Sequence, residues 1–422
     1  MYIKTSVTTK LKLLNMLENS SLGSVSIFVP ILANMLTNSY LMVGVIAGAY
    51  GLTQALSYIY FGRQSDKHGN MVMLVRLGFL TSAASFYMHI LAYDGFTLLL
   101  LRVSAGVSTG MYAGALLALA HSKGNNSGLV GVVSFGSLGW LVGSLSSGII
   151  QHISNNYNLA FISAGSMFLL GFIVSLRLED INASNNNCNI CIDAYLSCNY
   201  SKVRRRLDGL LHLIHLLRRN RAVYSTFMLR HLGASMTWSI FPIFLHDELK
   251  LSSIEIGSIY AINALTQFVF MSKAMGRIVS MHNMNSMLLQ LGTMLSAFVF
   301  ILYYFATSYL YLVVVQVILG VSWSLLYVGS LINLFNLNGN GSKASVSSLL
   351  ESMISIAVIV GSILGGMIAE LFGLRSVILA SFVLNVCAFV ITAVSRFNRN
   401  VGVSMLNGIV RKLLILVKVS SN

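Results

Sequence analysis

The sequence is poor in charged residues and in cysteine, and these shortages exclude several classes of protein. Asp, Glu, Lys and Arg make up 9% of the 422 residues, whereas hydrophobic residues make up 56%. A soluble chain of this composition would expose large apolar patches, so a soluble globular protein is excluded. Four cysteines give no disulfide framework. Glu18 and Asn19 interrupt the first apolar run, so no cleavable signal peptide is predicted.

Long apolar runs fill most of the chain. The mean hydropathy is +0.77, and the runs are long enough to cross a hydrocarbon core of roughly 30 Å as helices. No run alternates with a period of two, as the strands of a membrane barrel would. The sequence therefore predicts an all-α integral membrane protein with twelve transmembrane helices. They are expected at residues 12–36, 40–61, 71–92, 96–120, 128–152, 158–177, 222–246, 254–275, 284–305, 309–335, 344–369 and 374–395.

Basic residues are placed unevenly along the chain. The formal net charge is +15, from 27 Lys and Arg against 12 Asp and Glu. All but four of these basic residues lie in the two tails, the central segment and every second loop. The four are Lys250 and Arg375 in the opposite loops and Arg102 and Arg230 inside predicted helices. Because positive residues mark the cytoplasmic side, both termini are predicted in the cytoplasm and the membrane is expected to be the plasma membrane. This placement indicates contact with the lipid bilayer and argues against a nucleic-acid partner.

The chain contains two prolines, and they mark an internal repeat. Pro30 lies in "SIFVPIL" and Pro242 in "SIFPIFL", 212 residues apart. Further matches follow in the same order: Gly44 with Gly257, "LTQ" at 52–54 with 265–267, "GRQSDKHGNMVMLVRLG" from Gly62 with "GRIVSMHNMNSMLLQLG" from Gly276, "RVSAGVS" at 102–108 with "QVILGVS" at 316–322, and "GSLSSG" at 143–148 with "GSILGG" at 361–366. The sequence therefore predicts two halves of six helices each, with the same orientation because six is an even number.

The repeat divides the chain into four parts. Residues 1–178 form the first bundle, 179–221 a cytoplasmic linker, 222–396 the second bundle and 397–422 a basic cytoplasmic tail. The linker contains "KVRRRLDGLLHLIHLLRRNR", which is typical of an amphipathic helix at the membrane surface. It also holds Cys188, Cys191 and Cys198, with His212 and His215 further on. These could bind zinc, but the loose spacing favours free thiols, and no metal or cofactor is predicted.

The loop "FGRQSDKHGN" at 61–70 concentrates charge between two apolar runs. With two six-helix halves, this loop resembles the major facilitator superfamily, whose loop between helices two and three reads Gly-x-x-x-Asp-x-x-Gly followed by basic residues. Gly62, Asp66 and Gly69 match, whereas Asn70 and Met71 replace the basic pair. A second resemblance is the Arg-x-x-x-Gly pattern of the fourth helix, given by Arg102 and Gly106.

The resemblance implies a secondary transporter with a conformational latch in this loop. Asp66 would hold the cytoplasmic face closed, and Arg63 or Arg76 would complete its network. Gly62, Lys67 and Gly69 belong to the same motif, and Gly62 is expected to allow a tight turn out of the second helix. The alternative is that the cluster only fixes orientation and the turn.

Four charged residues lie inside predicted helices and are candidates for coupling or substrate binding. Glu18 and Arg230 each lie twelve residues before the proline of their half, so they are related by the repeat and could pair across the two halves. The other two are Arg102, which has Gln316 as its repeat partner, and Glu351; His231 beside Arg230 can also titrate. For Glu18, Arg230 and Glu351, the alternative is that the side chains snorkel to the inner headgroups. Arg102 lies near the outer end of its helix, so the same alternative, with the outer headgroups, applies to it.

Uncharged polar and aromatic residues in the helices are further candidates for a substrate cavity. They are Gln54, Gln267, Gln316, Trp238 and Trp323, with Asn263, Tyr112 and Tyr327 beside them. Gln54 and Gln267 are repeat-equivalent. A buried amide needs a hydrogen-bond partner, so these residues could bind a substrate or join helices, and the sequence does not decide between the two.

The favoured function is a monomeric secondary transporter that moves a small molecule by alternating access. Coupling to protons through Glu18, His231 or Glu351 is expected. Glycines in the fifth helix weakly favour export, although Ser144 stands where exporters carry proline. The alternative is a receptor or sensor on the same fold. No P-loop, zinc-protease motif or nucleophile elbow is present, so an enzyme is not predicted. The substrate cannot be read from the sequence.

Overall fold

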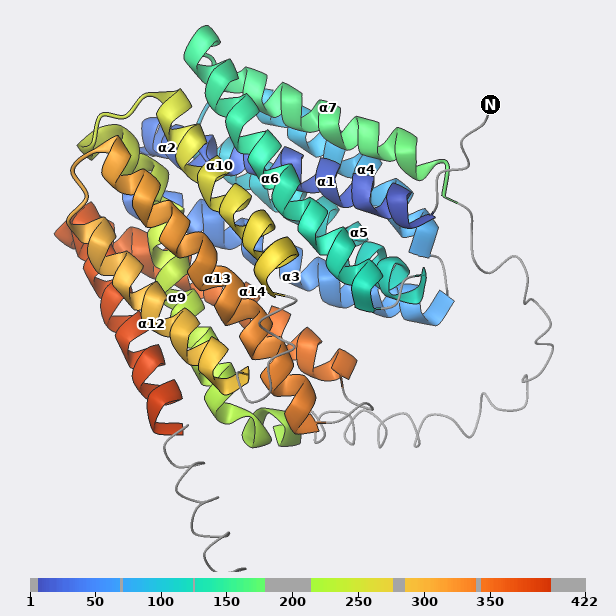
Figure 1. Ribbon diagram of the computed structural model, residues 1–422. Helices are drawn as coiled ribbons and strands as arrows, with labels where there is room; N and C mark the ends of the chain where they lie inside the picture. Colours follow the sequence, from blue (N-terminus) through green and yellow to red (C-terminus); the bar gives the residue numbers. More distant parts are fainter. Residues whose placement is uncertain are drawn as a thin grey trace, which may run out of the picture.

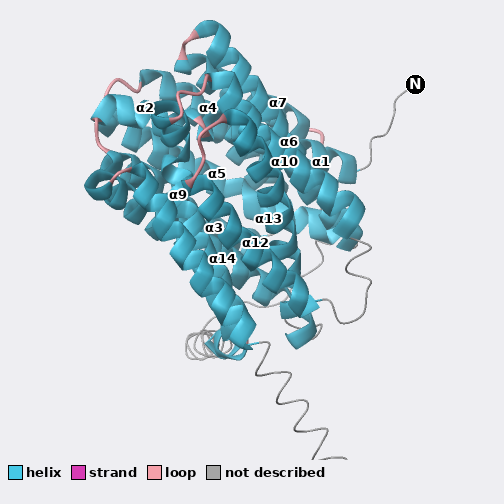
Figure 2. Ribbon diagram, turned by 60° about the vertical axis from the view of Figure 1, so that its left-hand side comes forward, coloured by secondary structure: helices cyan, strands magenta, loops and turns pink. Residues whose placement is uncertain are grey.

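The computed structural model describes residues 7–68, 71–123, 126–178, 214–275, 285–338 and 343–395. Every regular element in these ranges is helical (Figure 2). This follows from the apolar sequence, because a helix satisfies its backbone hydrogen bonds within itself and lipid offers none. Nine of the described helices are long and apolar enough to cross a membrane. Three more long helices, α5 (Gly95–Lys123), α6 (Asn126–Ser154) and α9 (Arg221–Ile243), complete the twelve expected crossings.

The first half contains six crossings. They are formed by α1 (Val7–Ser26) with α2 (Phe28–Thr37), α3 (Tyr40–His68), α4 (Met71–Met88) with the short η1 (His89–Leu91), α5 (Gly95–Lys123), α6 (Asn126–Ser154) and α7 (Tyr157–Ser175). Helix α1 packs on α6 and α7, and α5 packs on α3 and α4 (Figure 1).

The second half repeats this pattern. It consists of α9 (Arg221–Ile243) with the π-helical turn η3 (Phe244–Glu248), α10 (Ser253–Val269) with η4 (Phe270–Met275), α12 (Asn285–Tyr304), α13 (Tyr309–Asn338), α14 (Lys343–Phe372) and a last helix, Leu374–Ser395. Helix α9 packs on α14, and α13 packs on α10 and α12. The two halves meet where α10 packs on α6 and α14 packs on α3.

The first and second crossings differ from the sequence expectation. The first is broken at Ile27, because Pro30 has no N–H to donate and its ring crowds the carbonyl four residues earlier, at Ser26. The second continues as helix to His68, so the turn expected at Gly62 was wrong. Residues 62–68 contain no proline, and a single glycine does not end a helix. Most of the linker, including its three cysteines, and the basic tail lie outside the described residues.

Backbone geometry in the loops repeats between the halves. Among the described residues, the positive φ angles belong to Asn38 (49°), Lys250 (55°), Asn155 (48°) and Gly373 (84°). Asn38 and Lys250 are 212 residues apart (250 − 38), the separation of the two prolines. Asn155 and Gly373 are 218 apart (373 − 155), as are the two "GS…G" segments. All four lie at one end of the molecule, here called the loop end, so the repeat seen in sequence is also a repeat in conformation.

The halves touch at the loop end through two glycine contacts that are equivalent by the repeat. A Cβ atom built on Gly44 of α3 would lie 2.3 Å from the Ser362 carbonyl oxygen of α14 and 3.2 Å from the Cα of Gly366. In the other contact, a Cβ on Gly257 of α10 would lie 2.5 Å from the Ser144 carbonyl oxygen of α6 and 2.9 Å from the Cα of Gly148. These four glycines are called the seal. They leave no room for side chains between the paired backbones.

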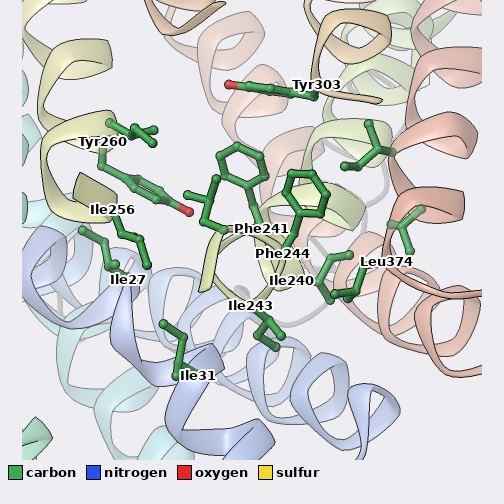
Figure 3. Close-up of a cluster of buried hydrophobic side chains, with 14 of the residues drawn as sticks. Ile27, Ile31, Ile240, Phe241, Ile243, Phe244, Ile256, Tyr260, Tyr303 and Leu374 are labelled. Carbon is green, nitrogen blue, oxygen red and sulfur yellow. The ribbon is translucent and has the colours of Figure 1, made fainter. Parts of the chain in front are cut away.

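Side chains of both halves pack around the seal. Figure 3 shows Ile27 and Ile31 of the first half beside Ile243, Ile256 and Phe244 of the second. This buried cluster extends along α9, α10 and the start of the last helix. Burial at the loop end is therefore shared between the halves, so their association here depends on apolar packing.

Polar groups also cross between the halves at the loop end. The Glu370 carboxylate at the end of α14 accepts hydrogen bonds from the backbone N–H groups of Tyr40 (2.6 Å) and Leu41 (3.3 Å). Those N–H groups open α3, so a residue of one half caps a helix of the other. Within the halves, Asp94 caps α5 through the Thr97 N–H at 2.6 Å, and hydrogen bonds from Thr97 lower the pKa of Asp94.

A side chain at the seal should separate the halves. We expect Gly44→Val to drive α3 from α14, because its Cβ would overlap the Ser362 carbonyl. Spin labels at Met35→Cys and Phe372→Cys in a cysteine-free background should then report a longer distance across the loop end. Gly292→Val is the matched control, since its Cβ would lie 2.5 Å from the Leu326 nitrogen inside the second half. The control should lower thermal stability without lengthening that distance. An unchanged distance in Gly44→Val would show that the seal does not hold the halves together.

Candidate functional site

A cavity of about 310 Å³ lies between the two halves. It is lined by Ser26 of α1, Ser137 and Trp140 of α6, Trp238 of α9, and Tyr260, Asn263, Ala264 and Gln267 of α10. Trp140 lies four residues before Ser144, whose carbonyl oxygen contacts the seal glycine Gly257. Tyr260 lies three residues after Gly257. The cavity therefore begins about one helical turn beyond the seal.

Aromatic rings form one wall of the cavity. The Trp238 ring meets the Tyr260 ring edge to face at 4.9 Å between centroids, and the Phe241 ring at 5.7 Å. Figure 3 shows the Tyr260 hydroxyl directed toward the cluster that contains Phe241. Trp140 is held by close packing on α1, because a Cβ at Gly23 would lie 3.2 Å from its ring and backbone. These contacts fix the ring planes before any solute binds.

Two amide side chains lie one turn apart on the cavity side of α10. The Gln267 Nε2 donates to the Asn263 Oδ1, while the Asn263 Nδ2 has no hydrogen-bond partner within the described part of the chain. The repeat-equivalent pair in α3 is Tyr50 and Gln54, and there the Gln54 Nε2 donates to the Tyr50 hydroxyl at 3.2 Å. In both halves, the side chains at these repeat-equivalent positions are therefore polar and hydrogen-bonded to each other.

The Arg-x-x-x-Gly pattern of α5 has a direct structural reason. A Cβ at Gly106 would lie 2.5 Å from the Tyr50 carbonyl oxygen, so glycine lets α5 approach α3. One turn earlier, the Arg102 guanidinium lies over the Tyr50 ring, 4.1 Å from its centroid. The Tyr50 hydroxyl is 3.3 Å from the Thr109 Oγ1, and Gln54 reaches the same oxygen at 3.3 Å. Arg102 is thus held by a cation–π contact inside the first half rather than at the cavity wall.

Glu18 is buried in α1, and 8% of its surface is exposed. Its carboxyl group faces the Tyr112 hydroxyl, although without a well-formed hydrogen bond, and lies within electrostatic reach of Tyr50. The ion pairs among the described residues are His246 with Asp247 and Arg375 with Glu248, all at the loop end. Glu18 and Arg230 are therefore not paired in this conformation, and their pairing in another conformation stays a prediction.

Arg230 occupies the equivalent place in the second half and has its own partners. Its Nε donates to the Ser296 hydroxyl at 2.9 Å, and its guanidinium lies 5.0 Å from the Trp323 ring centroid. His231 places its Nδ1 2.7 Å from the Phe227 carbonyl oxygen and its ring edge to face with Trp323 at 5.0 Å. The structure therefore brings Arg230, His231 and Trp323 together, but away from the residues that line the cavity.

Other predicted site residues lie elsewhere. Gln316 is fully buried in α13, and neither polar atom of its amide has a partner among the described residues. Glu351 lies in α14, where its side chain is outside the described set. Gly62, Arg63, Asp66 and Lys67 belong to the last turns of α3 without described side chains, and Gly69 lies outside the described residues. Arg76 donates to the carbonyl oxygens of Ser175 and Leu178 at the end of α7, at 3.3 and 2.7 Å.

Sequence reasoning missed several residues of the site. Trp140, Ser26, Ser137 and Tyr260 line the cavity, and Tyr50 links the groups around Arg102. Two signals were available: Trp140 is one of only three tryptophans, and Tyr50 is the repeat partner of Asn263. His89 is not part of the cavity lining; it is buried between the Phe86 and Phe161 rings and places its Nδ1 2.8 Å from the Ser85 carbonyl oxygen.

Comparison of the sequence with protein families gives one match that covers most of the chain. The profile described as Major Facilitator Superfamily matches residues 13–187 and 223–414. No sequence among the curated proteins matches this chain. The two matched segments are separated by residues 188–222.

Solved structures of transporters share the fold at low sequence identity. The nucleoside transporter NupG is 12% identical with a TM-score of 0.69, over 92% of this chain and 99% of that one. A POT family transporter in complex with a thioalcohol-conjugated peptide is 14% identical with a TM-score of 0.72, over 92% and 95%. A bacterial homolog of the human lysosomal transporter Spinster, inward-facing and occupied, is 15% identical with a TM-score of 0.70, over 92% and 96%. At these identities the likeness shows the fold alone.

Arg102 and its repeat partner Gln316 should respond differently to substitution. We expect Arg102→Ala to abolish or uncouple transport, because it removes the guanidinium that stacks on Tyr50. Gln316→Ala should be milder, because its amide has no partner to lose among the described residues. Solute flux into proteoliposomes that contain each purified variant measures the difference. Equal and small losses for the two variants would remove Arg102 from the mechanism.

Proposed function

The chain belongs to the major facilitator superfamily of secondary transporters, and we propose that it moves its solute by alternating access coupled to protons through Glu18. The observation that carries this proposal is the arrangement of the seal and the cavity. The halves are joined by backbone contacts at the loop end, and the cavity lies between them one turn further in. A site enclosed at one end by a breakable contact between two rigid halves is what alternating access requires.

We further propose that the loop end faces outside the cell, with both termini in the cytoplasm of a plasma-membrane protein. The loop-end residues include Asp94, Asp247, Glu248 and Glu370, whereas basic residues concentrate in the opposite loops. Arg375, one of two basic residues at the loop end, donates to Glu248 at 2.8 Å. With this orientation the described conformation is inward-facing.

Glu18 is the best-placed proton carrier among the three residues expected from the sequence. It is buried, belongs to a helix that approaches the cavity through Ser26, and has no cation within ion-pair distance among the described residues. Ionisable residues of this kind in membrane proteins commonly form proton relays. Tyr50 lies within electrostatic reach of both Glu18 and Arg102. His231 is less suitable, since its ring is enclosed by Phe227 and Trp323.

A sensor without transport remains the second interpretation of the fold, but no described feature favours it. A sensor needs no cavity between the halves, whereas this chain has one lined by residues from both. The glycines of α6 do not favour export over import either. Gly136, Gly139 and Gly143 face α1, and a Cβ on any of them would approach α1 atoms to within 3 Å. They are explained by helix packing.

Replacing the Glu18 carboxyl should remove the response to pH. We expect the spin-label distance between Met35→Cys and Phe372→Cys to change between acidic and mildly alkaline pH in the otherwise native protein. In Glu18→Gln the distance should be the same at both, because an amide neither gains nor loses a proton. The measurement needs no knowledge of the solute.

The control for Glu18→Gln is another Glu→Gln change that keeps local structure. Glu255 forms a capping box with Ser252 at the start of α10, and glutamine also serves in that motif. Glu255→Gln should therefore keep the pH response of the parent protein. If Glu18→Gln keeps it as well, protons do not act through Glu18.

We also propose that Asp66 latches the cytoplasmic face in the outward-facing state, as the family motif implies. Asp66→Asn should leave expression and thermal stability intact, because it removes a latch and no core contact, while strongly reducing transport. Cysteine accessibility from the cytoplasmic side should increase in this variant. Normal transport with unchanged accessibility would reduce Asp66 to a residue that shapes the end of α3.

A further inference from the structure

We propose that the cavity binds an uncharged heteroaromatic solute with hydrogen-bond donors and acceptors along one edge of its ring. This inference names the substrate class of the transporter and so rests on the proposed function. Three properties of the cavity support it: its described lining carries no charge, its walls include aromatic rings, and its polar groups include two adjacent amides beside the hydroxyls of Ser26, Ser137 and Tyr260.

Among the described residues, the cavity offers no counter-charge. None of its eight described lining residues is Asp, Glu, Lys, Arg or His. The buried guanidinium groups are engaged elsewhere: Arg102 lies over the Tyr50 ring, and Arg230 is bonded to Ser296 and lies near Trp323. A charged solute would lose its hydration without gaining a partner, which is unfavourable in a poorly hydrated site. The lining therefore favours neutral solutes.

The aromatic rings favour a flat solute. Trp140 and Trp238 come from different halves, and together they are two of the three tryptophans in the chain. Trp238 is braced by the rings of Tyr260 and Phe241, and Trp140 by its packing on Gly23. Pre-oriented rings bind the face of a planar solute by stacking, and little side-chain freedom is lost on binding.

The two amides favour a solute that carries hydrogen-bond donors and acceptors along one edge of its ring. Asn263 Nδ2 is an unused donor within the described part of the chain, and Asn263 Oδ1 already accepts from Gln267 Nε2. Gln267 keeps the acceptor capacity of its carbonyl oxygen and one further N–H. Adjacent donors and acceptors of this kind match the amide-like edge of a heterocyclic base, the same complementarity by which Asn and Gln read adenine.

The size of the cavity restricts the class further. About 310 Å³ is at the low end of ligand pockets, which span roughly 300–1,000 Å³. One ring or a fused pair of rings fits this space. Uracil and adenine are therefore suitable probes of the class.

The test is equilibrium binding to the purified full-length protein, measured by calorimetry and by the shift in melting temperature. Uracil and adenine should bind and raise the melting temperature. Orotate is uracil with an added carboxylate, and 1,3-dimethyluracil is uracil with both ring N–H groups blocked. Each should bind at least about tenfold more weakly than uracil, the change expected from losing roughly one hydrogen bond or from carrying an unpaired charge. Glucose, a neutral solute without a flat ring, should not compete.

Variants assign the binding to the cavity. Gln267→Leu and Trp238→Ala should each weaken uracil binding about tenfold or more, again roughly the value of one interaction. Asn158→Ala removes an amide at the start of α7 that is not part of the cavity lining, and this variant should bind uracil as the parent protein does. Melting temperature and gel filtration of the ligand-free variants show whether each is folded, and Asn263→Ala provides a second amide variant if Gln267→Leu is not.

The outcomes separate this inference from the proposed function. Binding is measured without a gradient, so loss of proton coupling leaves the binding result unaffected. Orotate binding as tightly as uracil, glucose displacing uracil, or no binding of either base would each overturn the inference. A pH response that depends on Glu18 would in those cases still support the proposed transporter. Conversely, uracil binding with an unchanged pH response in Glu18→Gln would keep the substrate class and refute coupling through Glu18.

Discussion

The close approach of backbones at four glycines is the constraint on which this structure depends. Gly44 meets Gly366, and Gly257 meets Gly148, with no side chain between the paired helices. This contact sets the separation of α3 from α14 and of α6 from α10. Because α6 and α10 also carry most of the cavity lining, the same contact fixes how far Trp140 stands from the amides of α10. The geometry of the cavity is thus a consequence of the absence of side chains at the seal.

The repeat gives the molecule a symmetric framework with asymmetric chemistry. Loop conformations and seal contacts obey the repeat, down to the paired carbonyls of Ser144 and Ser362. The buried side chains do not obey it. The repeat relates Glu18 to Arg230, and it relates Arg102 to Gln316, so residues of different charge occupy equivalent positions. The first half holds a carboxyl group that can carry a proton, whereas the cavity lining comes mainly from the second half. The proposed proton coupling would therefore use a site in the first half that is separate from the cavity, with the symmetric pair of seal contacts between the halves.

The sequence predicted the framework well and the lining of the cavity only in part, for physical reasons. Helix positions follow from long apolar runs, and the two halves follow from repeated segments, so both are local properties of the chain. The break at Ile27 was also available, from the effect of Pro30 on the carbonyl of Ser26. The cavity was available only in part: Trp238, Asn263 and Gln267 were candidates from the sequence, but their meeting with Trp140 depends on which faces of α6, α9 and α10 pack together. Charge in a helix drew attention to Arg102 and Arg230, yet both found partners inside their own halves.

A transporter needs a seal that holds and that can also be broken, and the nature of these contacts suits both needs. Glycine pairs contribute dispersion and weak Cα–H···O contacts, and they avoid the desolvated ion pairs that are costly to break. The Glu370 cap on α3 adds about 1 kcal/mol, a typical value for a helix cap.

A solute shifts the balance between two conformations only by its difference in affinity for them. A few kcal/mol of difference in solute affinity between the two conformations is then comparable with the contribution of the Glu370 cap. Opening must also expose the apolar cluster around Ile27 and Ile243, so the solute alone faces the larger cost. In the proposed mechanism, a proton on Glu18 supplies a second source of free energy.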